Sequence, residues 1–534
     1  MIFYGGPIIT MNEKQMFVNA IGVRDEKIVA VGELDGVKEK MDGDFEVLDL
    51  QGNTLMPGFH DSHCHPIAYI LTFVVLNLRD VKNYSDFNSR ITEFIKNKNE
   101  GEWIIGVNFS EIEFDAKERH LPDRTLLDAL SQNNPIIIIR YDGHIAIVNS
   151  KALEIARITK DTIPPEGSEY RKDSKGELAG IITEDAVKEF LSNYSFPSLA
   201  EMSKAAELAF DNYARLGITT LHGIYNLVKG KDEIGYSALE IPVIKSNQEK
   251  IHQNWYGLVN TKKPGEIISI QCPPLDGEQD DSKFKARALK LYIDGSFGAS
   301  TAWMHEPFTD NLESSGFCVH ENLEDLYELM KEAHELGLQI CVHAIGDKGN
   351  RVIVDLYKRL LIEFPKENHR HRIEHASMCT SDVISDIKDL GLIASIQPSF
   401  ITTDAPMLKY RIGEARCKYT YNIRSLIEAG IICASGSDCP VENPDVIKGL
   451  HVLVNRDGFV PEEAISIKEA LKTYTINAAY AAFEENVKGS IEEGKLADLV
   501  ILDRNPLEIP KEEIKRINVL RTIIRGRTVF QSVK

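Results

Sequence analysis

The stretch HDSHCHP, residues 60–66, places three histidines, an aspartate and a cysteine directly after an apolar segment that includes Pro57 and Gly58. His63 and His65 are two residues apart, which puts both imidazoles on the same face of a strand end. Neutral imidazole is a ligand for zinc and similar divalent ions, so the pair predicts one wall of a metal site. The alternative is a polar surface loop that is rich in histidine.

Four more ionisable residues end or interrupt apolar runs elsewhere in the chain. They are His343 in LQICVHAIGD, His375 in HRIEHAS, Asp438 in GIICASGSD and Lys290 in ARALKLYIDGS. Taken alone, each histidine is better explained as a structural core residue, and the alternative for the aspartate is the cap of a following helix. The carboxyl ends of the strands of a β/α barrel meet at one mouth, however, and such groups then lie together. We therefore expect these residues to share one site with the first histidine pair.

Lys290 lies within an apolar, strand-like segment, where a buried ammonium is costly unless it is paired or neutralised. It has two structural explanations: a side chain that reaches solvent, or an ion pair with Asp294. A neutral buried lysine is also a nucleophile toward carbon dioxide, and the resulting carbamate has two oxygens that can bridge two cations. The residues allow this modification without requiring it.

The elements that carry these residues differ between the ends and the middle of the chain. Both ends consist of short β-branched runs broken by glycine and charged turns, which predicts one β-domain from residues 1–57 and 488–534. Residues 58–67 and 200–487 alternate apolar runs with amphipathic helical stretches, which predicts βα units around a parallel sheet. Residues 68–199 fit no regular repeat, and we expect an insertion that shapes the substrate pocket.

The composition excludes several classes of partner and location. The chain has 534 residues and a formal net charge of −20, so nucleic acid and anionic membranes are not expected partners. Eight scattered cysteines without a C-x-x-C pair favour a reducing cytosol. The start lacks the basic flank of a signal peptide, and the apolar run 67–76 is short of the roughly 20 residues that span a bilayer. We expect a cytoplasmic protein.

Five motifs, taken in order, resemble the amidohydrolase superfamily, and within it the branch of YtcJ-like hydrolases and N-substituted formamide deformylase. They are PGFHDSHCHP, LKLYIDGSFG, VHAIGDKG, RIEHA and ASGSDCPV. The terminal segments VRDEKIVAVGE and KGSIEEGKLADLVILDRNP resemble the β-sandwich segments of that superfamily. The resemblance implies a distorted (β/α)8 TIM barrel, a small β-sandwich domain built from both termini, and an inserted α/β segment after strand 1. It also implies one or two divalent metal ions at the mouth, usually zinc.

The resemblance implies a role for each motif residue as well. The ligand set that it implies runs from the first strand to the eighth: His63, His65, Lys290, His343, His375 and Asp438. Lys290 would be the bridging carboxylated lysine of the fourth strand. Asp438 would be the catalytic aspartate of the eighth strand as well as a metal ligand. His60 is a third histidine beside the usual pair.

Four further residues are candidates for contact with the substrate, each with ordinary structural hydrogen bonding as the alternative. They are His144, His222, Gln397 and Arg416.

The chemistry that follows is hydrolysis of a non-peptide C–N bond of a small N-acyl or N-formyl amide by a metal-activated water. Asp438 would accept the proton of that water and pass it to the departing amine. The alternatives are a cyclic-amide hydrolase or deaminase on the same site, or a catalytically silent scaffold. The sequence leaves open the substrate, the number of metal ions and the oligomeric state. A homo-oligomer is one of the states that it allows.

Overall fold

The computed structural model describes residues 1–532 apart from 80, 112–113, 116, 141–144, 166–167, 184–185, 188–189, 191–196, 228–236 and 270–281. The chain forms two compact units. The first, here called the barrel unit, comprises Met1–Ile67, Ala209–Glu233 and Asn247–Lys534, and the second, the inserted unit, comprises Ala68–Leu208 and Ile234–Ser246. Among the described residues, every helix is too short or too polar to cross a membrane.

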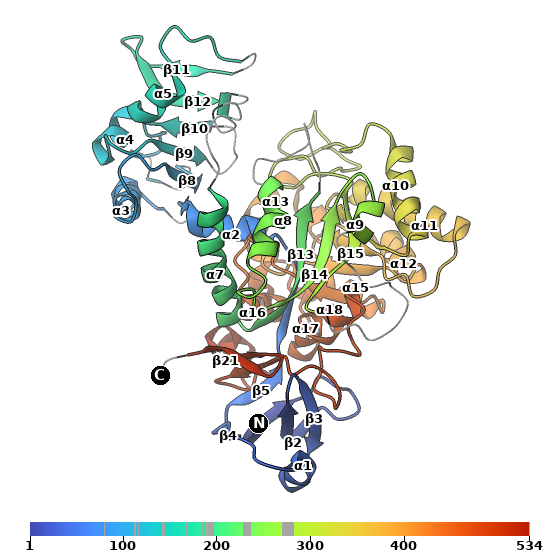
Figure 1. Ribbon diagram of the computed structural model, residues 1–534. Coiled ribbons are helices and arrows are strands. Elements are labelled where there is room, and N and C mark those ends of the chain that lie inside the picture. The colour runs from blue at the N-terminus through green and yellow to red at the C-terminus, as the bar shows by residue number, and fades with distance from the viewer. Residues whose placement is uncertain are drawn as a thin grey trace. The chain divides into compact units, whose positions relative to one another are not determined.

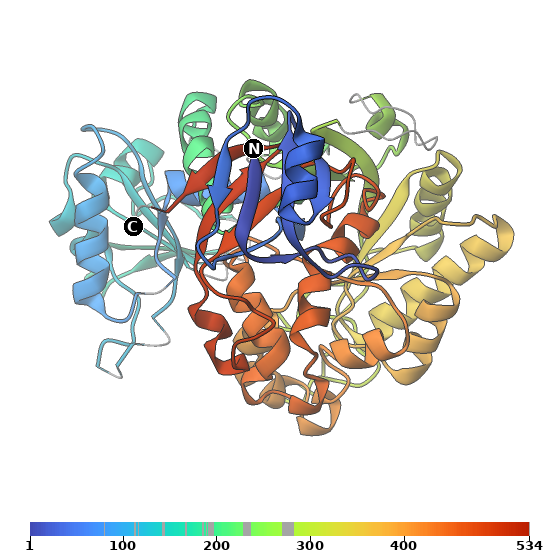
Figure 2. The same cartoon turned by 90° about the horizontal axis from the view of Figure 1, so that it is seen from below.

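Strands from the two ends of the chain pair in one sheet of the barrel unit, with the order β22-β21-β20-β5-β1-β2-β3 and β4 on β1. In Figures 1 and 2 the blue N-terminal strands and the red C-terminal strands lie side by side. The strands are β1 (Ile2–Ile9), β2 (Phe17–Arg24), β3 (Lys27–Gly32), β4 (Val47–Asp49), β5 (Thr54–Pro57), β20 (Leu499–Leu502), β21 (Val519–Ile524) and β22 (Arg527–Gln531). The two ends meet where β5 pairs antiparallel with β20. The predicted β-domain from both termini is confirmed.

A second sheet of the barrel unit is parallel throughout and contains eight strands in the described part of the chain. In spatial order these are β6 (Phe59–Cys64), β13 (Ile218–Asn226), β14 (Asn254–Asn260), β15 (Phe284–Tyr292), β16 (Gln339–Ala344), β17 (Arg372–His375), β18 (Ile393–Ile396) and β19 (Cys433–Ser435). The spatial order equals the chain order and the last strand, β19, contacts the first, β6, so the sheet forms the predicted distorted (β/α)8 barrel.

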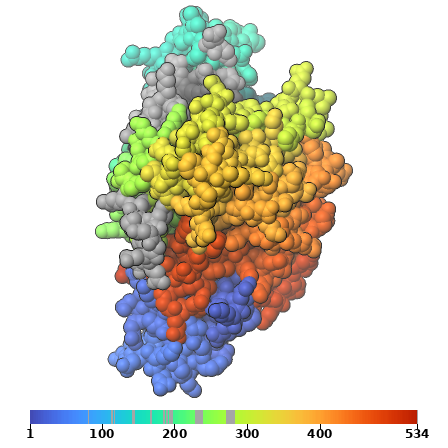
Figure 3. All heavy atoms as spheres, turned by 90° about the vertical axis from the view of Figure 1, so that its right-hand side faces the viewer, coloured from blue at the N-terminus to red at the C-terminus, as the bar shows by residue number. Residues whose placement is uncertain are grey.

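Helices connect successive barrel strands and cover the sheet from outside. They include α10 (Leu323–Glu335), α11 (Asp347–Glu363), α12 (Ser381–Asp389), α13 (Phe400–Arg411), α14 (Glu414–Cys417), α15 (Ile423–Glu428), α16 (Val446–Asn455), α17 (Ile467–Thr473) and α18 (Ile476–Ala481). Figure 3 shows the yellow and orange part of this layer on one side of the barrel unit. Polar caps explain where several helices begin: Asp445 accepts from the Lys448 N–H before α16, and Ser466 forms a capping box with Glu469 at α17.

The first and last barrel strands meet beyond their ends in a seam that joins β6 to the segment after β19. The Asp438 N–H donates to the His63 carbonyl over 2.7 Å, and the His65 N–H donates to the Cys439 carbonyl over 2.8 Å. Gly436 makes this approach possible, since a Cβ at this position would lie 2.4 Å from the His63 nitrogen. The seam therefore brings the two ends of the barrel sequence to one place.

The inserted unit has its own sheet, with the order β11-β12-β10-β9-β8-β7. The strands are β7 (Leu76–Asn77), β8 (Ile104–Phe109), β9 (Ile136–Arg140), β10 (Ile145–Val148), β11 (Tyr170–Lys172) and β12 (Leu178–Thr183), with helices α3 (Tyr84–Ile95), α4 (Arg124–Leu130), α5 (Ser150–Ala156) and α8 (Ser237–Ser246). Helices α2 (Pro66–Val74) and α7 (Leu199–Arg215) run across the unit borders. Phe87, Phe109 and Ile138 belong to a separate buried core. The inserted α/β segment is confirmed, whereas the predicted boundaries and its part in the substrate pocket stay predictions.

Three histidines form a hydrogen-bonded chain near the amino ends of β16 and β17. The Ile340 N–H donates to Nδ1 of His371 over 3.0 Å, so the proton of His371 is on Nε2, 2.8 Å from Nδ1 of His334. His334 in turn donates through Nε2 to the Phe364 carbonyl, and His369 Nδ1 accepts the His371 N–H. Each imidazole is thereby held neutral. A second ring proton would occupy the nitrogen that already accepts a hydrogen bond, and it would displace the donor of that bond.

We predict that Gly436→Ala destabilises the fold by about 1–3 kcal/mol, because the added methyl group meets the backbone of His63 rather than a movable side chain. Thermal unfolding of purified protein measures the change. Gly36→Ala is the control, because nothing lies within 4 Å of a Cβ at this position in helix α1 (Leu34–Met41). Equal unfolding temperatures for both variants would show that the seam tolerates a side chain.

We also predict that the metal-depleted protein loses stability as the pH falls below about 6.5, the ordinary pKa of histidine. Burial lowers the pKa of His334, His369 and His371 below that value. The unfolded chain therefore takes up protons at a higher pH than the folded chain, so this stability is complete above about pH 6.5 and is lost as acid is added. His371→Asn should reduce the slope of unfolding free energy against pH, with His305→Asn at an exposed position as the control. An unchanged slope would contradict the assignment.

Candidate metal centre

Three donor groups meet at the seam of the barrel. Asp438 Oδ1 lies 3.1 Å from His65 Nε2 and 3.5 Å from His63 Nε2, and the three donor atoms all lie within 4.8 Å of one another. The His63 side chain is buried, and that of His65 is 28% exposed. Two imidazole nitrogens and a carboxylate oxygen are donors that zinc and similar ions bind, so the residues present fit a divalent ion. Asp438 does not cap a helix, since α16 begins at Val446 with Asp445 as its cap.

His343 and His375 lie beside this cluster, at the ends of β16 and β17. The ring centres of His375 and His63 are 4.7 Å apart, and those of His375 and His343 are 4.5 Å apart. His375 and Asp438 both have a left-handed backbone, with φ of 73° and 57°. Such a backbone is rare for residues other than glycine, asparagine and aspartate, and it clusters at functional sites. The strand ends thus turn sharply where the predicted ligands lie.

Each of three histidines uses one ring nitrogen for a contact with a protein oxygen. His63 Nδ1 contacts Glu374 Oε2, His375 Nδ1 lies 2.7 Å from Gln397 Oε1, and His343 Nε2 lies 3.0 Å from the Gly295 carbonyl. Such partners fix the tautomer and the ring orientation of a metal-binding histidine. They leave Nε2 of His63, Nε2 of His375 and Nδ1 of His343 as the nitrogens that can bind an ion.

Burial and neighbouring charges set the protonation of these groups. Burial lowers the pKa of His343 to about 3, helped by the charge of Lys290, and burial also lowers the pKa of His63 and His375. Burial alone would raise the pKa of Asp438, but the hydrogen bond from His65 and the nearby positive charges hold it below its usual value. Neutral imidazoles beside an ionised carboxylate are the forms that bind a cation.

Lys290 is fully buried on β15, so its side chain does not reach solvent, which was the first of its two structural explanations. Its Nζ lies 4.1 Å from the ring centre of Tyr292, and burial lowers its pKa to about 8 against the attraction of Glu374 and Asp438. Among the described residues Lys290 forms no ion pair with Asp294, and that carboxylate instead accepts the N–H groups of Trp303, Ile345 and Gly346. Carboxylation of Lys290 stays a prediction.

Asp61 ties the first strand to the segment that carries Asp438. Its Oδ1 accepts the Ser437 N–H over 2.8 Å, and its Oδ2 accepts the Ser437 hydroxyl over 2.5 Å. Its Oδ1 also lies 3.4 Å from the His63 N–H. One buried carboxylate thereby reaches the backbone of two neighbouring segments that carry predicted ligands.

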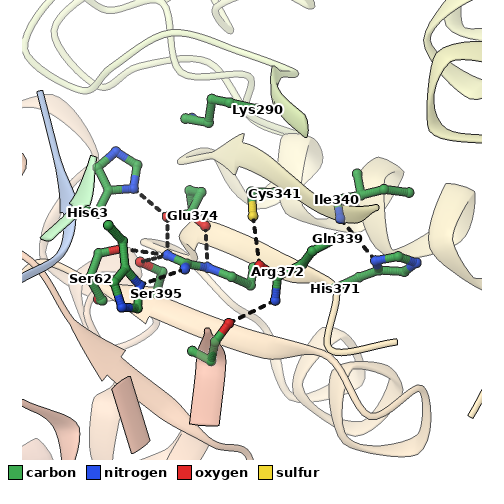
Figure 4. A network of polar contacts seen from close by, with 12 residues as sticks. Ser62, His63, Lys290, Gln339, Ile340, Cys341, His371, Arg372, Glu374 and Ser395 are labelled. Carbon is green, nitrogen blue, oxygen red and sulfur yellow. Dashed lines mark hydrogen bonds and ion pairs between the residues drawn. The ribbon is translucent and has the colours of Figure 1, made fainter. Parts of the chain in front are cut away.

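Arg372 and Glu374 form a fully buried ion pair below His63, as Figure 4 shows. Arg372 Nε lies 2.7 Å from Glu374 Oε1, and Nη2 lies 3.0 Å from Oε2. Burial would raise the pKa of Glu374, but the charges of Arg372, His63 and Lys290 hold it far below its usual value. No role was predicted for either residue of the RIEHA motif. Two opposite charges spaced i, i+2, and therefore on one face of a short strand, were the available signal.

The predicted substrate residues have structural contacts where they are described. His222 is buried and accepts from Arg372 Nη1 over 3.1 Å, and Gln397 contacts His375. Arg416 donates to the carbonyls of Ile412, Glu306 and Pro307. His144 lies outside the described residues. Contact of these four residues with substrate therefore stays a prediction.

The chain is similar to metal-dependent hydrolases over almost its whole length. The putative amidohydrolase YtcJ of Bacillus subtilis (strain 168) is 28% identical and covers 99% of both chains. N-substituted formamide deformylase of Arthrobacter pascens is 24% identical over 97% of this chain and 96% of its own. An uncharacterised metal-dependent hydrolase from Pyrococcus horikoshii has a TM-score of 0.77 at 26% identity and covers 96% of this chain and 99% of its own.

Residues 46–530 match the Amidohydrolase family. The match includes all six predicted ligands and confirms the resemblance that the five motifs indicated. The chain therefore belongs to the amidohydrolase family, as a metal-dependent hydrolase that acts on carbon–nitrogen bonds.

Proposed function

We propose that the protein hydrolyses the C–N bond of small N-acyl or N-formyl amides with the help of a zinc ion. The observation that carries the proposal is the meeting of His63, His65 and Asp438 at the barrel seam, with one donor atom of each within 4.8 Å of the others. The choice of substrate class is supported by the N-substituted formamide deformylase of Arthrobacter pascens, to which the chain is similar over nearly its full length.

The proposed ligands divide into two groups by their place in the barrel. His63 and His65 come from the first strand end, and Asp438 from the seam opposite them. His343 and His375 extend the set along the mouth, and Lys290, once carboxylated, would supply oxygens for a second ion. When bound, a divalent ion supplies an activated water and polarises the carbonyl oxygen of the substrate.

Asp438 is the proposed proton carrier. Its carboxylate is ionised in the free protein, since the nearby imidazoles and ammonium lower its pKa, so an oxygen can accept a proton from the attacking water. An amide nitrogen is a poor leaving group until it is protonated. A carboxyl group that has just received a proton beside the breaking bond can return it to that nitrogen, and one residue then serves both steps.

The scaffold alternative is not supported by the buried contacts of the ligand side chains. His63, His343 and His375 each have one ring nitrogen fixed by a protein oxygen and the other directed away from that partner. A scaffold needs no such division of ring nitrogens, whereas a metal-binding histidine needs it for its tautomer.

We predict that Asp438→Asn keeps metal but lowers kcat by about 10²–10⁴-fold, the usual contribution of general acid–base catalysis. The amide has nearly the same shape as the carboxyl group but cannot take up a proton near neutral pH. Elemental analysis and steady-state kinetics measure the two effects. Asp445→Asn is a matched control, because asparagine can also accept the Lys448 N–H at the start of α16. Full turnover by Asp438→Asn would refute the proton-carrying role.

We further predict that zinc-loaded protein releases amine from members of a panel of N-formyl and N-acyl amines, and that a chelator abolishes this release until zinc is restored. The panel should also contain cyclic amides and aminated heterocycles. Cleavage of only those compounds would favour the cyclic-amide or deaminase alternative. A metal-free protein that is inactive on the whole panel after zinc loading would instead support the scaffold.

A further inference from the structure

The buried pair of Arg372 and Glu374 has an arrangement that stability alone does not explain. Both side chains are fully buried. Removing two charges from water costs several kcal/mol per ion, and apolar residues in place of such a pair are often equally or more stabilising. The pair also contacts a proposed metal ligand, because Glu374 Oε2 lies against His63 Nδ1.

The hydrogen-bonding capacities of the three groups decide which nitrogen of His63 carries the proton. Arg372 has only donors: Nη2 donates to Glu374 Oε2, and Nε lies 2.7 Å from Oε1 in the ion pair. The ionised Glu374 carboxylate has only acceptors, so His63 Nδ1 must donate to it. The lone pair of His63 is therefore on Nε2, which lies 3.5 Å from Asp438 Oδ1.

Arg372 holds the carboxylate in place through contacts with several strands. Its Nη2 donates to the Ser62 carbonyl over 2.6 Å and to the Ser395 hydroxyl over 3.0 Å, and its Nη1 donates to His222 Nδ1. Figure 4 shows the guanidinium between Ser62, Ser395 and Glu374, with His63 on the other side of the carboxylate. The guanidinium thus connects β6, β13, β17 and β18 around one carboxylate.

His63 differs from His343 and His375 in the kind of partner that orients it. His375 is oriented by the neutral amide of Gln397 and His343 by the carbonyl of Gly295. A carboxylate partner makes an imidazole a stronger donor toward a metal than a neutral partner does. Glu374 thus gives His63 a direct carboxylate contact, whereas the carboxylate nearest His343 Nε2, Asp294 Oδ1, lies 3.5 Å away.

We propose that Glu374 is a positioning residue of the metal centre: its carboxylate fixes the tautomer and ring of His63 with Nε2 toward the ion, and Arg372 holds that carboxylate. The inference rests on the proposed assignment of His63 as a metal ligand. It adds a residue that touches neither ion nor substrate and acts only through His63.

The test is the affinity of the full-length protein for zinc, measured by competition with a chromogenic chelator. In Glu374→Gln an NH₂ group replaces one of the two oxygens that face Arg372. At the Oε2 position it also faces His63 Nδ1 and selects the wrong tautomer, whereas at the Oε1 position it meets the donor Nε of Arg372. In both cases His63 loses its carboxylate partner, and we expect zinc affinity to fall by about 10–100-fold. The visible absorption of cobalt-substituted protein should change as well, because the ligand field at His63 changes. Wild-type affinity in folded Glu374→Gln protein would overturn the proposal.

Glu484→Gln is the matched control, since Glu484 lies in a second buried ion pair with Lys285 and Lys488 and contacts none of the proposed ligands in the described residues. We expect it to lower the unfolding temperature while zinc affinity stays within about twofold of wild type. Equal losses of affinity in both variants would mean a general effect of destabilisation and would overturn the proposal.

Two further variants keep the test decisive. If Glu374→Gln does not fold, Glu374→Asp retains the charge beside Arg372 but shortens the reach toward His63, and zinc affinity should still fall. His63→Asn tests the assignment of His63 as a metal ligand separately from the positioning role of Glu374. Loss of zinc in His63→Asn together with wild-type affinity in both Glu374 variants would refute the positioning role alone. Unchanged zinc affinity in His63→Asn would refute the ligand assignment itself.

Discussion

Two backbone hydrogen bonds join the end of β6 to the segment after β19, and the proposed metal centre depends on this seam. They bring His63 and His65 to Asp438, although the two segments lie at opposite ends of the barrel sequence. Gly436 allows the close approach, and the Asp61 carboxylate adds side-chain bonds across it. Because barrel strands are parallel, the closing of the sheet places all strand ends at one mouth. The closure of the barrel thus sets the distances between the donor atoms of His63, His65 and Asp438, which no single local segment determines.

The groups around this mouth are held in states that cost folding free energy, and this cost is offset elsewhere in the protein. The left-handed backbone at His375 and Asp438 and the buried charges of Arg372 and Glu374 each oppose folding by amounts on the order of 1–3 kcal/mol or more. The apolar interior of the barrel and the separate core of the β-domain offset these costs. The mouth of the barrel can therefore hold a strained polar arrangement, because the surrounding apolar cores stabilise the fold.

The sequence predicted what periodicity and residue type can encode. The spacing of His63 and His65, and the apolar runs that lead to His343 and Asp438, indicated strand ends with metal-binding side chains, and the resemblance of the five motifs to the amidohydrolase superfamily implied the barrel in which they meet. The partners of those residues were not predictable in the same way. Glu374 and Asp61 act on groups from other strands, and the identity of a partner across a sheet depends on register, which no single segment contains. The inserted segment was recognised only by its lack of a regular pattern, and its sheet order could not be derived.

The balance of charge in the mouth connects Lys290 to the rest of the site. In the free protein the negative charges of Asp438 and Glu374 face the positive charges of Lys290 and Arg372, all in a buried environment. A divalent ion adds two positive charges to this region, and unbalanced buried charge is costly. Conversion of Lys290 to a carbamate replaces a cation with an anion, which offsets the two charges that the ion adds. Arg372 cannot make that change, because its guanidinium stays protonated. Of these two cations, Lys290 is the one that can change its charge when a metal ion binds, which supports the predicted carboxylation.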